Sequence, residues 1–174
     1  MHTACGPRCR RTPEGVARGG PFKRTRRGDF ELRLDPKERD ILRELPDQLR
    51  TLIENEDPTS DPAMARLYPP AYEDDPIRNL EFERVAGDDL TSQRLSSIVA
   101  MEGSIDADRV TEEQLLSWLS VLNDLRLVLG TRLEITEETT EDDFAADDPR
   151  ASTFALYAYL TWLVDSIVRA LDRG

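Results

Sequence analysis

The segment TEEQLLSWLSVLNDLRLVLGTRL, residues 111–133, contains the strongest helical pattern in the chain. Thr111 and Gln114 have the spacing of a capping box, in which each side chain accepts a hydrogen bond from the other residue's backbone N–H. Leucines then recur every three or four residues as far as Leu133, which is the period of an apolar helix face. We therefore predict a central helix here and a mainly α fold around it.

Asp-Pro pairs mark three further helix starts, because Asp caps free N–H groups and Pro is tolerated at the first helical position. They are Asp35-Pro36, Asp75-Pro76 and Asp148-Pro149. We predict helices from each pair to about residues 53, 101 and 171, with an irregular connection over residues 57–72. Two residues should disturb this pattern: Pro46 should kink or split the first helix, and Gly87 should interrupt the second.

Apolar residues at helical spacing supply the predicted core. The candidates in the first two of these helices are Ile41, Leu42, Leu45, Leu49, Leu52 and Ile53, then Leu80, Val85, Leu95, Ile98 and Val99. In the last helix, apolar residues between Phe154 and Val168 nearly encircle the axis. Such a helix is either deeply buried or partly an interface, and we favour burial.

The N-terminal region divides into a tail and a short hairpin. Residues 1–21 are rich in Gly and Pro and poor in apolar side chains, so we predict a disordered tail. In residues 22–34, alternating apolar residues flank Arg27-Gly28-Asp29, which is typical of a β-hairpin with a turn. The predicted fold is thus one domain over residues 22–174, a small bundle of four or five helices with a short N-terminal β-hairpin.

Charge is distributed unevenly along the chain. The net charge is -12, yet residues 1–27 hold eight Lys or Arg against Glu14 alone, which leaves 15 bases and 34 acids in residues 28–174. Eight of those acids and no base lie in the loop between Arg132 and Arg150. The acidic body favours a basic protein partner, although acids also keep a small domain in solution. The basic tail makes DNA a further candidate partner.

No membrane span and no signal peptide are predicted, because no apolar run approaches about 20 residues and the basic start lacks an apolar stretch. We therefore expect a cytoplasmic protein. An enzyme is not expected either, since the chain has no phosphate-binding loop and its one histidine, His2, lies in the predicted tail. No cofactor is predicted. A zinc site usually has four ligands, and His2 with the two cysteines offers only three, which argues against such a site.

Both cysteines of the chain lie in the tail, at Cys5 and Cys9. A Gly-Pro pair between them allows the chain to turn and bring the two sulfurs within disulfide reach. The neighbouring cations Arg8, Arg10 and Arg11 favour the thiolate, which is the form that oxidants attack. The pair is therefore either a small redox switch or an incidental feature of the tail. In a reducing cytoplasm a disulfide here would be transient and regulatory.

Several blocks of sequence resemble an actinobacterial family of oxidative-stress transcription regulators, the AosR-like family, long described as a domain of unknown function. The likeness covers most of residues 22–172. The blocks are Ala65-Arg66-Leu67-Tyr68-Pro69-Pro70-Ala71-Tyr72 with Asp74-Asp75, Glu81-Phe82-Glu83-Arg84, Leu122-Asn123-Asp124-Leu125-Arg126-Leu127-Val128-Leu129-Gly130-Thr131-Arg132-Leu133, and Tyr159-Leu160-Thr161-Trp162-Leu163.

The resemblance implies a regulator that senses oxidants through an N-terminal Cys-x3-Cys pair, which maps onto Cys5 and Cys9. It also implies action with RNA polymerase and a stress sigma factor rather than enzymatic chemistry. Our leading hypothesis is therefore a redox-sensing transcription regulator switched by a Cys5–Cys9 disulfide. The alternative is a constitutive acidic protein-interaction module in which the tail has no role.

Four polar residues interrupt the central apolar helix, and both a structural network and a partner-docking patch would explain them. They are Asn123, Asp124, Arg126 and Arg132. We favour the network, because polar groups between apolar neighbours need hydrogen-bond partners. Gly130 lies in the same helix at a cost of about 1 kcal/mol relative to alanine. It therefore predicts close helix packing or a bend.

Overall fold

The computed structural model describes residues 20–58, 60–69, 75–144 and 147–172. Within these ranges, only the backbone is described at residues 76, 78–86 and 141. Nearly all of the tail predicted to be disordered, residues 1–21, therefore lies outside the described residues.

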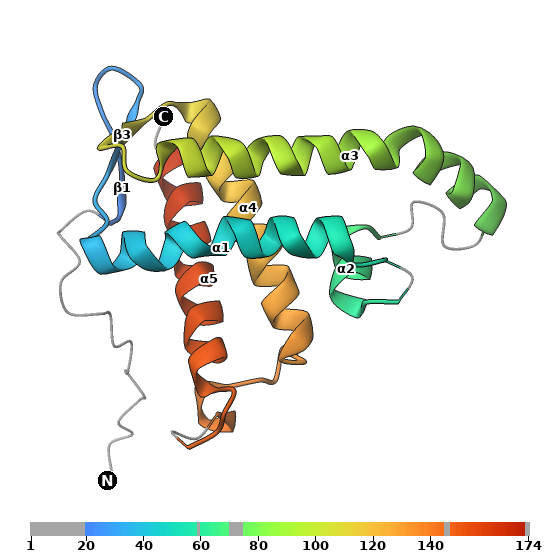
Figure 1. Ribbon diagram of the computed structural model, residues 1–174. Coiled ribbons are helices and arrows are strands. Elements are labelled where there is room, and N and C mark those ends of the chain that lie inside the picture. Colours follow the sequence, from blue (N-terminus) through green and yellow to red (C-terminus); the bar gives the residue numbers. More distant parts are fainter. Residues whose placement is uncertain (1–19, 59, 70–74, 145–146, 173–174) are drawn as a thin grey trace, which may run out of the picture.

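Five α-helices and a small sheet form the described part of the chain, which confirms the predicted mainly α class. The elements are β1 (Phe22–Arg24), β2 (Phe30–Leu32), α1 (Pro36–Asn55), α2 (Pro62–Leu67), α3 (Pro76–Ser104), β3 (Arg109–Val110), α4 (Glu112–Arg132), the 3-10 turn η1 (Glu141–Asp143) and α5 (Ala151–Leu171). Helices α1 and α3 lie side by side and antiparallel across a second antiparallel pair, α4 and α5 (Figure 1). The N-terminal half of α3 extends beyond this body.

The central helix forms as the sequence predicts. Thr111 caps α4 and exchanges both capping-box hydrogen bonds with Gln114. Trp118 is fully buried near the start of α4, and its indole N–H donates to the hydroxyl of Ser104 at 2.8 Å. Because buried polar groups are costly without partners, this bond fixes the end of α3 against α4.

The predicted hairpin is present, and it belongs to a three-stranded sheet in the order β1-β2-β3. Phe22 pairs with Leu32 across the hairpin, and Phe30 pairs with Val110 of β3. The third strand has only two residues, too few for an alternating pattern to predict. The ring of Phe22 meets that of Trp118 edge to face at 6.1 Å, so the sheet is continuous with the helical core.

Helix α1 begins at Asp35, whose carboxylate accepts from the Glu38 backbone N–H at 2.9 Å. The helix runs unbroken past Pro46, so the predicted split is wrong; the proline side chain is buried in the core. The irregular connection predicted after α1 is also wrong in part, because it contains α2. That helix starts at Asp61-Pro62, the same cap signal that marks α1.

Helix α3 is likewise continuous, so Gly87 does not interrupt it as predicted. Two predicted core residues are wrong: Val99 is 60% exposed and Ile41 is 48% exposed. Each lies one residue from a buried position, Ile98 and Leu42 respectively. One residue turns the helix by about 100°, which carries the side chain away from the core. The other predicted core positions are buried or half-buried where they are described, and the side chains of Leu80 and Val85 lie outside the description.

Helix α5 is buried on one side only, so the deep burial that we favoured is wrong for part of its surface. Its buried residues are Leu160, Leu163, Val164, Ile167 and Ala170. Phe154, Tyr157 and Trp162 are half-buried, and Val168 is exposed. By length and composition alone, this 21-residue helix would also be apolar enough to cross a membrane. In the structure one face of the helix packs antiparallel to α4.

Candidate functional site

The proposed redox residues cannot be placed by the structure. Cys5, Cys9, Arg8, Arg10 and Arg11 all lie outside the described residues. Their roles therefore stay predictions.

A buried ion pair joins α3 and α4 at the centre of the body. The guanidinium of Arg94 donates to the carboxylate of Asp124, which is 5% exposed. Arg94 also donates to the backbone carbonyl of Leu67 at 2.7 Å, and its guanidinium lies 5.1 Å from the ring centre of Tyr68. One arginine thus links α3, α4 and the end of α2.

Burial raises the pKa of Asp124, and the hydrogen bond and charge of Arg94 act in the opposite direction. The direction of the shift shows that desolvation outweighs the partner. Because a carboxylate in this position needs its cation, Asp124 belongs to a structural network rather than to an accessible docking patch.

Of the other polar residues of α4, Asn123 and Arg126 are half-buried and Arg132 is exposed. Arg126 donates to the side-chain oxygen of Asn123 at 2.8 Å, one turn back along the helix. Arg132 lies 3.8 Å from the carboxylate of Asp61. Since that carboxylate also accepts from the Ala63 backbone N–H at 2.7 Å, Arg132 supports the cap of α2.

Gly130 permits a close contact between α4 and α5. A Cβ at this position would lie 3.2 Å from the Tyr157 ring, tighter than ordinary van der Waals contact. The prediction of close helix packing at Gly130 is therefore confirmed. Beside this contact lies a shallow pocket that Arg66 and Arg126 also line.

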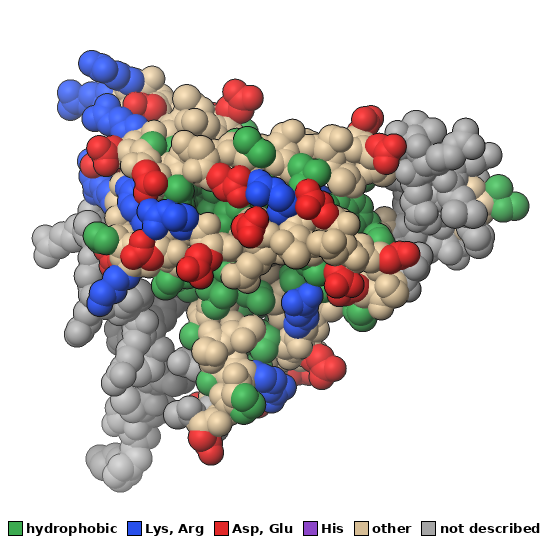
Figure 2. Space-filling model, in the orientation of Figure 1, with side chains coloured by type: hydrophobic (Ala, Val, Ile, Leu, Met, Phe, Trp, Pro, Cys, Tyr) green, Lys and Arg blue, Asp and Glu red, His purple; other side chains and the backbone are tan. Residues whose placement is uncertain are grey.

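A larger groove of about 360 Å³ runs between α1 and α4, and α5 closes one side with Leu156. We call it the α1–α4 groove. Its apolar lining residues are Leu45, Leu49, Leu52, Leu125, Val128, Leu129 and Leu156, and its polar ones are Asp47, Gln48, Thr51, Asn55, Glu56 and Arg132. Figure 2 shows hydrophobic side chains along this edge of α1 with acidic and basic residues around them. The polar rim holds two acids, Asp47 and Glu56, and one base, Arg132. An apolar floor with a polar rim suits an amphipathic helix.

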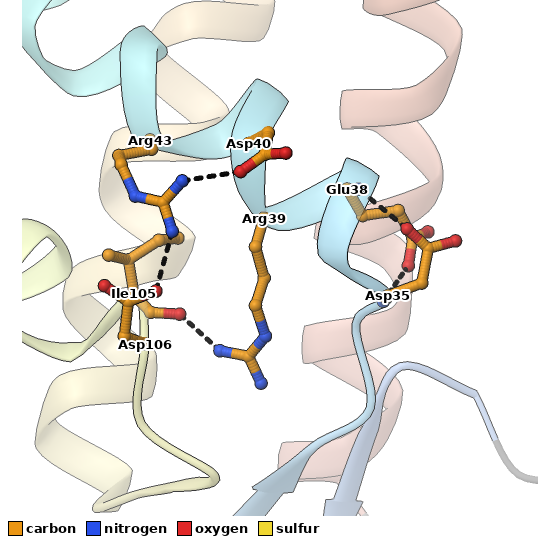
Figure 3. A network of polar contacts seen from close by, with 7 residues as sticks. All are labelled: Asp35, Glu38, Arg39, Asp40, Arg43, Ile105 and Asp106. Carbon is orange, nitrogen blue, oxygen red and sulfur yellow. Dashed lines mark hydrogen bonds and ion pairs between the residues drawn. The ribbon is translucent and has the colours of Figure 1, made fainter.

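A second polar network joins the hairpin to the helices (Figure 3). Arg39 of α1 donates to the carbonyls of Ile105 and Ala107 after α3, the latter at 3.1 Å, and it reaches the carbonyl of Leu32 in β2 at 3.5 Å. One turn along, Arg43 pairs with Asp40 and Asp106 at 2.7 Å each, in a more exposed position. Arg39 therefore ties β2 to the body beside the point where residues 1–19 join it.

The start of α1 is also tied to α5. The hydroxyl of Tyr159 donates to the carboxylate of Glu38 at 3.1 Å, while Glu38 accepts from the backbone N–H of Asp35 at 2.8 Å. Burial, followed by the charge and hydrogen bond of Glu38, raises the pKa of Tyr159 above its usual range. The phenol therefore stays protonated and holds α5 to the cap of α1.

Among the described residues, no group of three or more His, Cys, Asp or Glu is arranged to hold a metal ion. The described polar clusters are instead ion pairs and caps that link helices. The described surface also carries an apolar groove with a polar rim and a hairpin with exposed cations.

Comparison with known proteins identifies the family. The profile of a family described as a domain of unknown function, DUF2017, matches residues 19–171. The chain belongs to the DUF2017 family. The DUF2017 match begins just before β1 and ends at the last residue of α5, so it spans all the described secondary structure. No solved structure matches the chain.

Relatives of this DUF2017 chain carry a functional name. Proteins named "Oxidative stress regulator AosR" from Mycobacterium tuberculosis H37Rv and Mycobacterium bovis are each 29% identical over an alignment of 216 positions, gaps included. Each alignment covers 98% of this chain and 98% of the relative. The family resemblance inferred from the sequence blocks is thereby confirmed.

Sequence reasoning did not single out Arg94 or Arg39, the two arginines that organise the body. Neither lies in a motif, and a single arginine on a helix resembles any solvated residue. Tyr68 lies in one of the family blocks, but the sequence indicated no role for it; in the structure its ring lies against Arg94. Only the folded chain brings these residues to their partners.

Proposed function

We propose that this chain is a redox-sensing transcription regulator of the oxidative stress response. One observation carries the proposal: its likeness, over 98% of both chains, to proteins named oxidative stress regulators. A regulator would work in the cytoplasm through contacts with other macromolecules. The α1–α4 groove is a described surface on which such a contact could form.

In this proposal Cys5 and Cys9 form an intramolecular disulfide when peroxide is present. One thiolate attacks peroxide to give a sulfenic acid and water, and the second thiol then displaces a second water to form the S–S bond. The two thiols lose two protons and two electrons, and peroxide accepts both to become two molecules of water. Ring closure would restrict the tail and reposition Arg8, Arg10 and Arg11, thereby changing an electrostatic contact.

The attachment of the tail supports a link between the disulfide and the body. The carbonyl of Pro21 accepts from the backbone N–H of Arg33 at 2.8 Å, and Phe22 packs on Trp118. A constraint imposed on residues 1–19 therefore acts close to a sheet that Arg39 fixes to the helices. We propose that the regulated partner is RNA polymerase with a stress sigma factor.

The first test is mass spectrometry of the full chain under graded peroxide, with alkylation to count free thiols. The proposal expects loss of two hydrogen atoms, complete protection of both cysteines from alkylation, and reversal by reductant. Cys5→Ser and Cys9→Ser are matched controls that should block the bond equally. Thiols that stay free, or that oxidise only irreversibly, would contradict the switch.

A second test measures capture of RNA polymerase and the sigma factor by oxidised and reduced protein. Binding that depends on oxidation in the natural chain and not in Cys5→Ser supports the switch. If Cys5→Ser keeps the full oxidant dependence, the switch is wrong.

The α1–α4 groove favours a second candidate, a constitutive acidic interaction module. In that case a basic helical partner binds the groove whatever the state of the cysteines. Thr51→Lys places a cation on the polar edge of the groove, and Lys37→Glu serves as a control elsewhere on α1. Partner binding lost in Thr51→Lys and unaffected by peroxide would support the module and exclude the switch.

A further inference from the structure

The hairpin end of the molecule carries uncompensated positive charge. Lys23, Arg26 and Arg27 are exposed, and none of them forms an ion pair with a residue in the part of the chain that the structure describes. Figure 2 shows Lys and Arg side chains gathered where the hairpin projects from the body. This is the reverse of the charge on the rest of the domain, in which acids greatly outnumber bases.

The carboxylates of the hairpin compensate these cations only in part, because their hydrogen-bond and ion-pair partners are other residues, while the charges of Arg27 and Lys23 make smaller contributions at Asp29 and Glu31. Asp29 accepts from the Thr25 hydroxyl and lies 3.6 Å from Arg109, and Glu31 pairs with Arg33 at 3.0 Å. These hydrogen bonds lower the pKa of both acids, so both stay ionised within their pairs. Lys23 is opposite Glu31 in the strand register, but Arg33 is the residue that holds this carboxylate.

The turn presents its two arginines in a fixed position. The backbone N–H of Thr25 donates to the Asp29 carbonyl at 2.8 Å, and that of Gly28 donates to the Thr25 carbonyl at 3.2 Å. Gly28 has φ +92°, a left-handed conformation that strains residues with a side chain. Arg26 and Arg27 therefore lie at the tip of a closed ribbon, which lowers the entropy lost when they bind.

The surroundings of these cations favour a nucleic acid over a protein as the partner. The apolar residues of the ribbon, Phe22, Phe30 and Leu32, are all buried, so none is free to anchor a protein interface. Phosphates need only cations, and guanidinium groups bind them with two parallel hydrogen bonds. The major groove of B-form DNA is wide enough to admit a two-stranded β-ribbon between its two phosphate backbones, whereas the deep major groove of A-form RNA is too narrow for one.

We propose that the hairpin, through Arg26 and Arg27 with Lys23, binds the phosphate backbone of duplex DNA. The acidic body keeps the duplex from the rest of the surface and limits the contact to the ribbon. Such a contact adds affinity without reading sequence, and it requires neither cysteine. It goes beyond the proposed redox function and would hold a regulator close to DNA.

The test is fluorescence anisotropy of a labelled DNA duplex with the full-length reduced protein over a range of salt concentrations. Arg26→Glu/Arg27→Glu should weaken binding at low salt by tenfold or more and reduce the salt slope by about two. Two exposed arginines elsewhere give a matched control: Arg66→Glu/Arg169→Glu makes the same change in net charge. This control should retain most of the affinity. Circular dichroism of each variant checks that it is folded.

Other outcomes would overturn the proposal. Equal losses of DNA affinity in the hairpin and control variants would show that only net charge matters. If Arg8→Glu/Arg10→Glu loses DNA affinity and the hairpin variant does not, the contact lies in residues 1–19. If the hairpin variant binds DNA normally but fails to capture RNA polymerase, the ribbon contacts protein instead. Because the test uses reduced protein, its result does not depend on the proposed disulfide.

Discussion

The guanidinium of Arg94 on α3 and the buried carboxylate of Asp124 on α4 form an ion pair at the centre of the helical body. Arg94→Ala should lower the free energy of unfolding by about 3–5 kcal/mol, because it leaves a buried charge without a partner. Urea unfolding measures the loss. Arg169→Ala removes an exposed pair with Asp165 and should change stability by less than about 1 kcal/mol. Similar losses in the two variants would contradict a structural role for Asp124.

The same variant should also respond to pH. Burial already raises the pKa of Asp124, and removing Arg94 removes the group that opposes this rise. A raised folded-state pKa favours folding at low pH, and this contribution is lost as pH rises from about 4 through the folded-state value. The free energy of unfolding of Arg94→Ala should therefore fall further below that of the natural chain as pH increases from 4 to 7. Urea unfolding at several pH values tests this, and a constant difference would contradict it.

At Gly130, helix propensity and crowding by Tyr157 have opposite effects on the stability of an alanine variant. Alanine at residue 130 favours the helix by about 1 kcal/mol, but its Cβ would crowd the tyrosine ring. We expect Gly130→Ala alone to be nearly neutral or destabilising. In a Tyr157→Ala background the crowding is absent, so Gly130→Ala should add about 1 kcal/mol to the free energy of unfolding. A double-mutant cycle by thermal unfolding measures the coupling, and additive effects would contradict it.

Arg39 and Arg43 give a matched pair for testing how the hairpin is held. Arg39→Ala removes a donor to carbonyls of Ile105, Ala107 and Leu32, and it should cost about 2–3 kcal/mol. Arg43→Ala removes exposed ion pairs only and should leave stability almost unchanged, because solvent screens such pairs. Hydrogen exchange should show faster exchange at the β2 amides in Arg39→Ala alone. Equal protection of β2 in both variants would show that Arg39 does not anchor the sheet.

Local sequence signals predicted the helices well where caps and periodicity coincide. Thr111 with Gln114 and Asp35 with Glu38 form capping boxes in the structure, and the turn at Gly28 closes the hairpin. Signals that act against a helix proved weaker than packing. Helix α3 continues through Gly87, and α1 continues through Pro46, whose burial in the core offsets the lost backbone hydrogen bond.

The candidate surfaces were less predictable, because they depend on elements distant in the sequence. Asp124 was recognised as an interruption of an apolar helix, but its partner Arg94 comes from another helix. The groove beside Leu45 and Leu125 needs α1, α4 and α5 together. The excess of positive charge in residues 1–27 was evident from composition, yet which hairpin cations remain unpaired depends on where Arg33 and Arg109 lie.

The sequence by itself determined the starts of α1, α3 and α4, the hairpin turn, the family and the separation of a basic N-terminus from an acidic body. It missed α2, and α5 begins at Ala151 without a side-chain cap rather than at Asp148-Pro149. The features that it determined depend on neighbouring residues and on composition, which need no tertiary contact to be recognised. Only the tertiary structure decided which side of α5 is buried, which carboxylate needs Arg94, and which cations of the hairpin stay free. Burial and charge pairing are set by residues far apart in the chain, and folding alone brings them together.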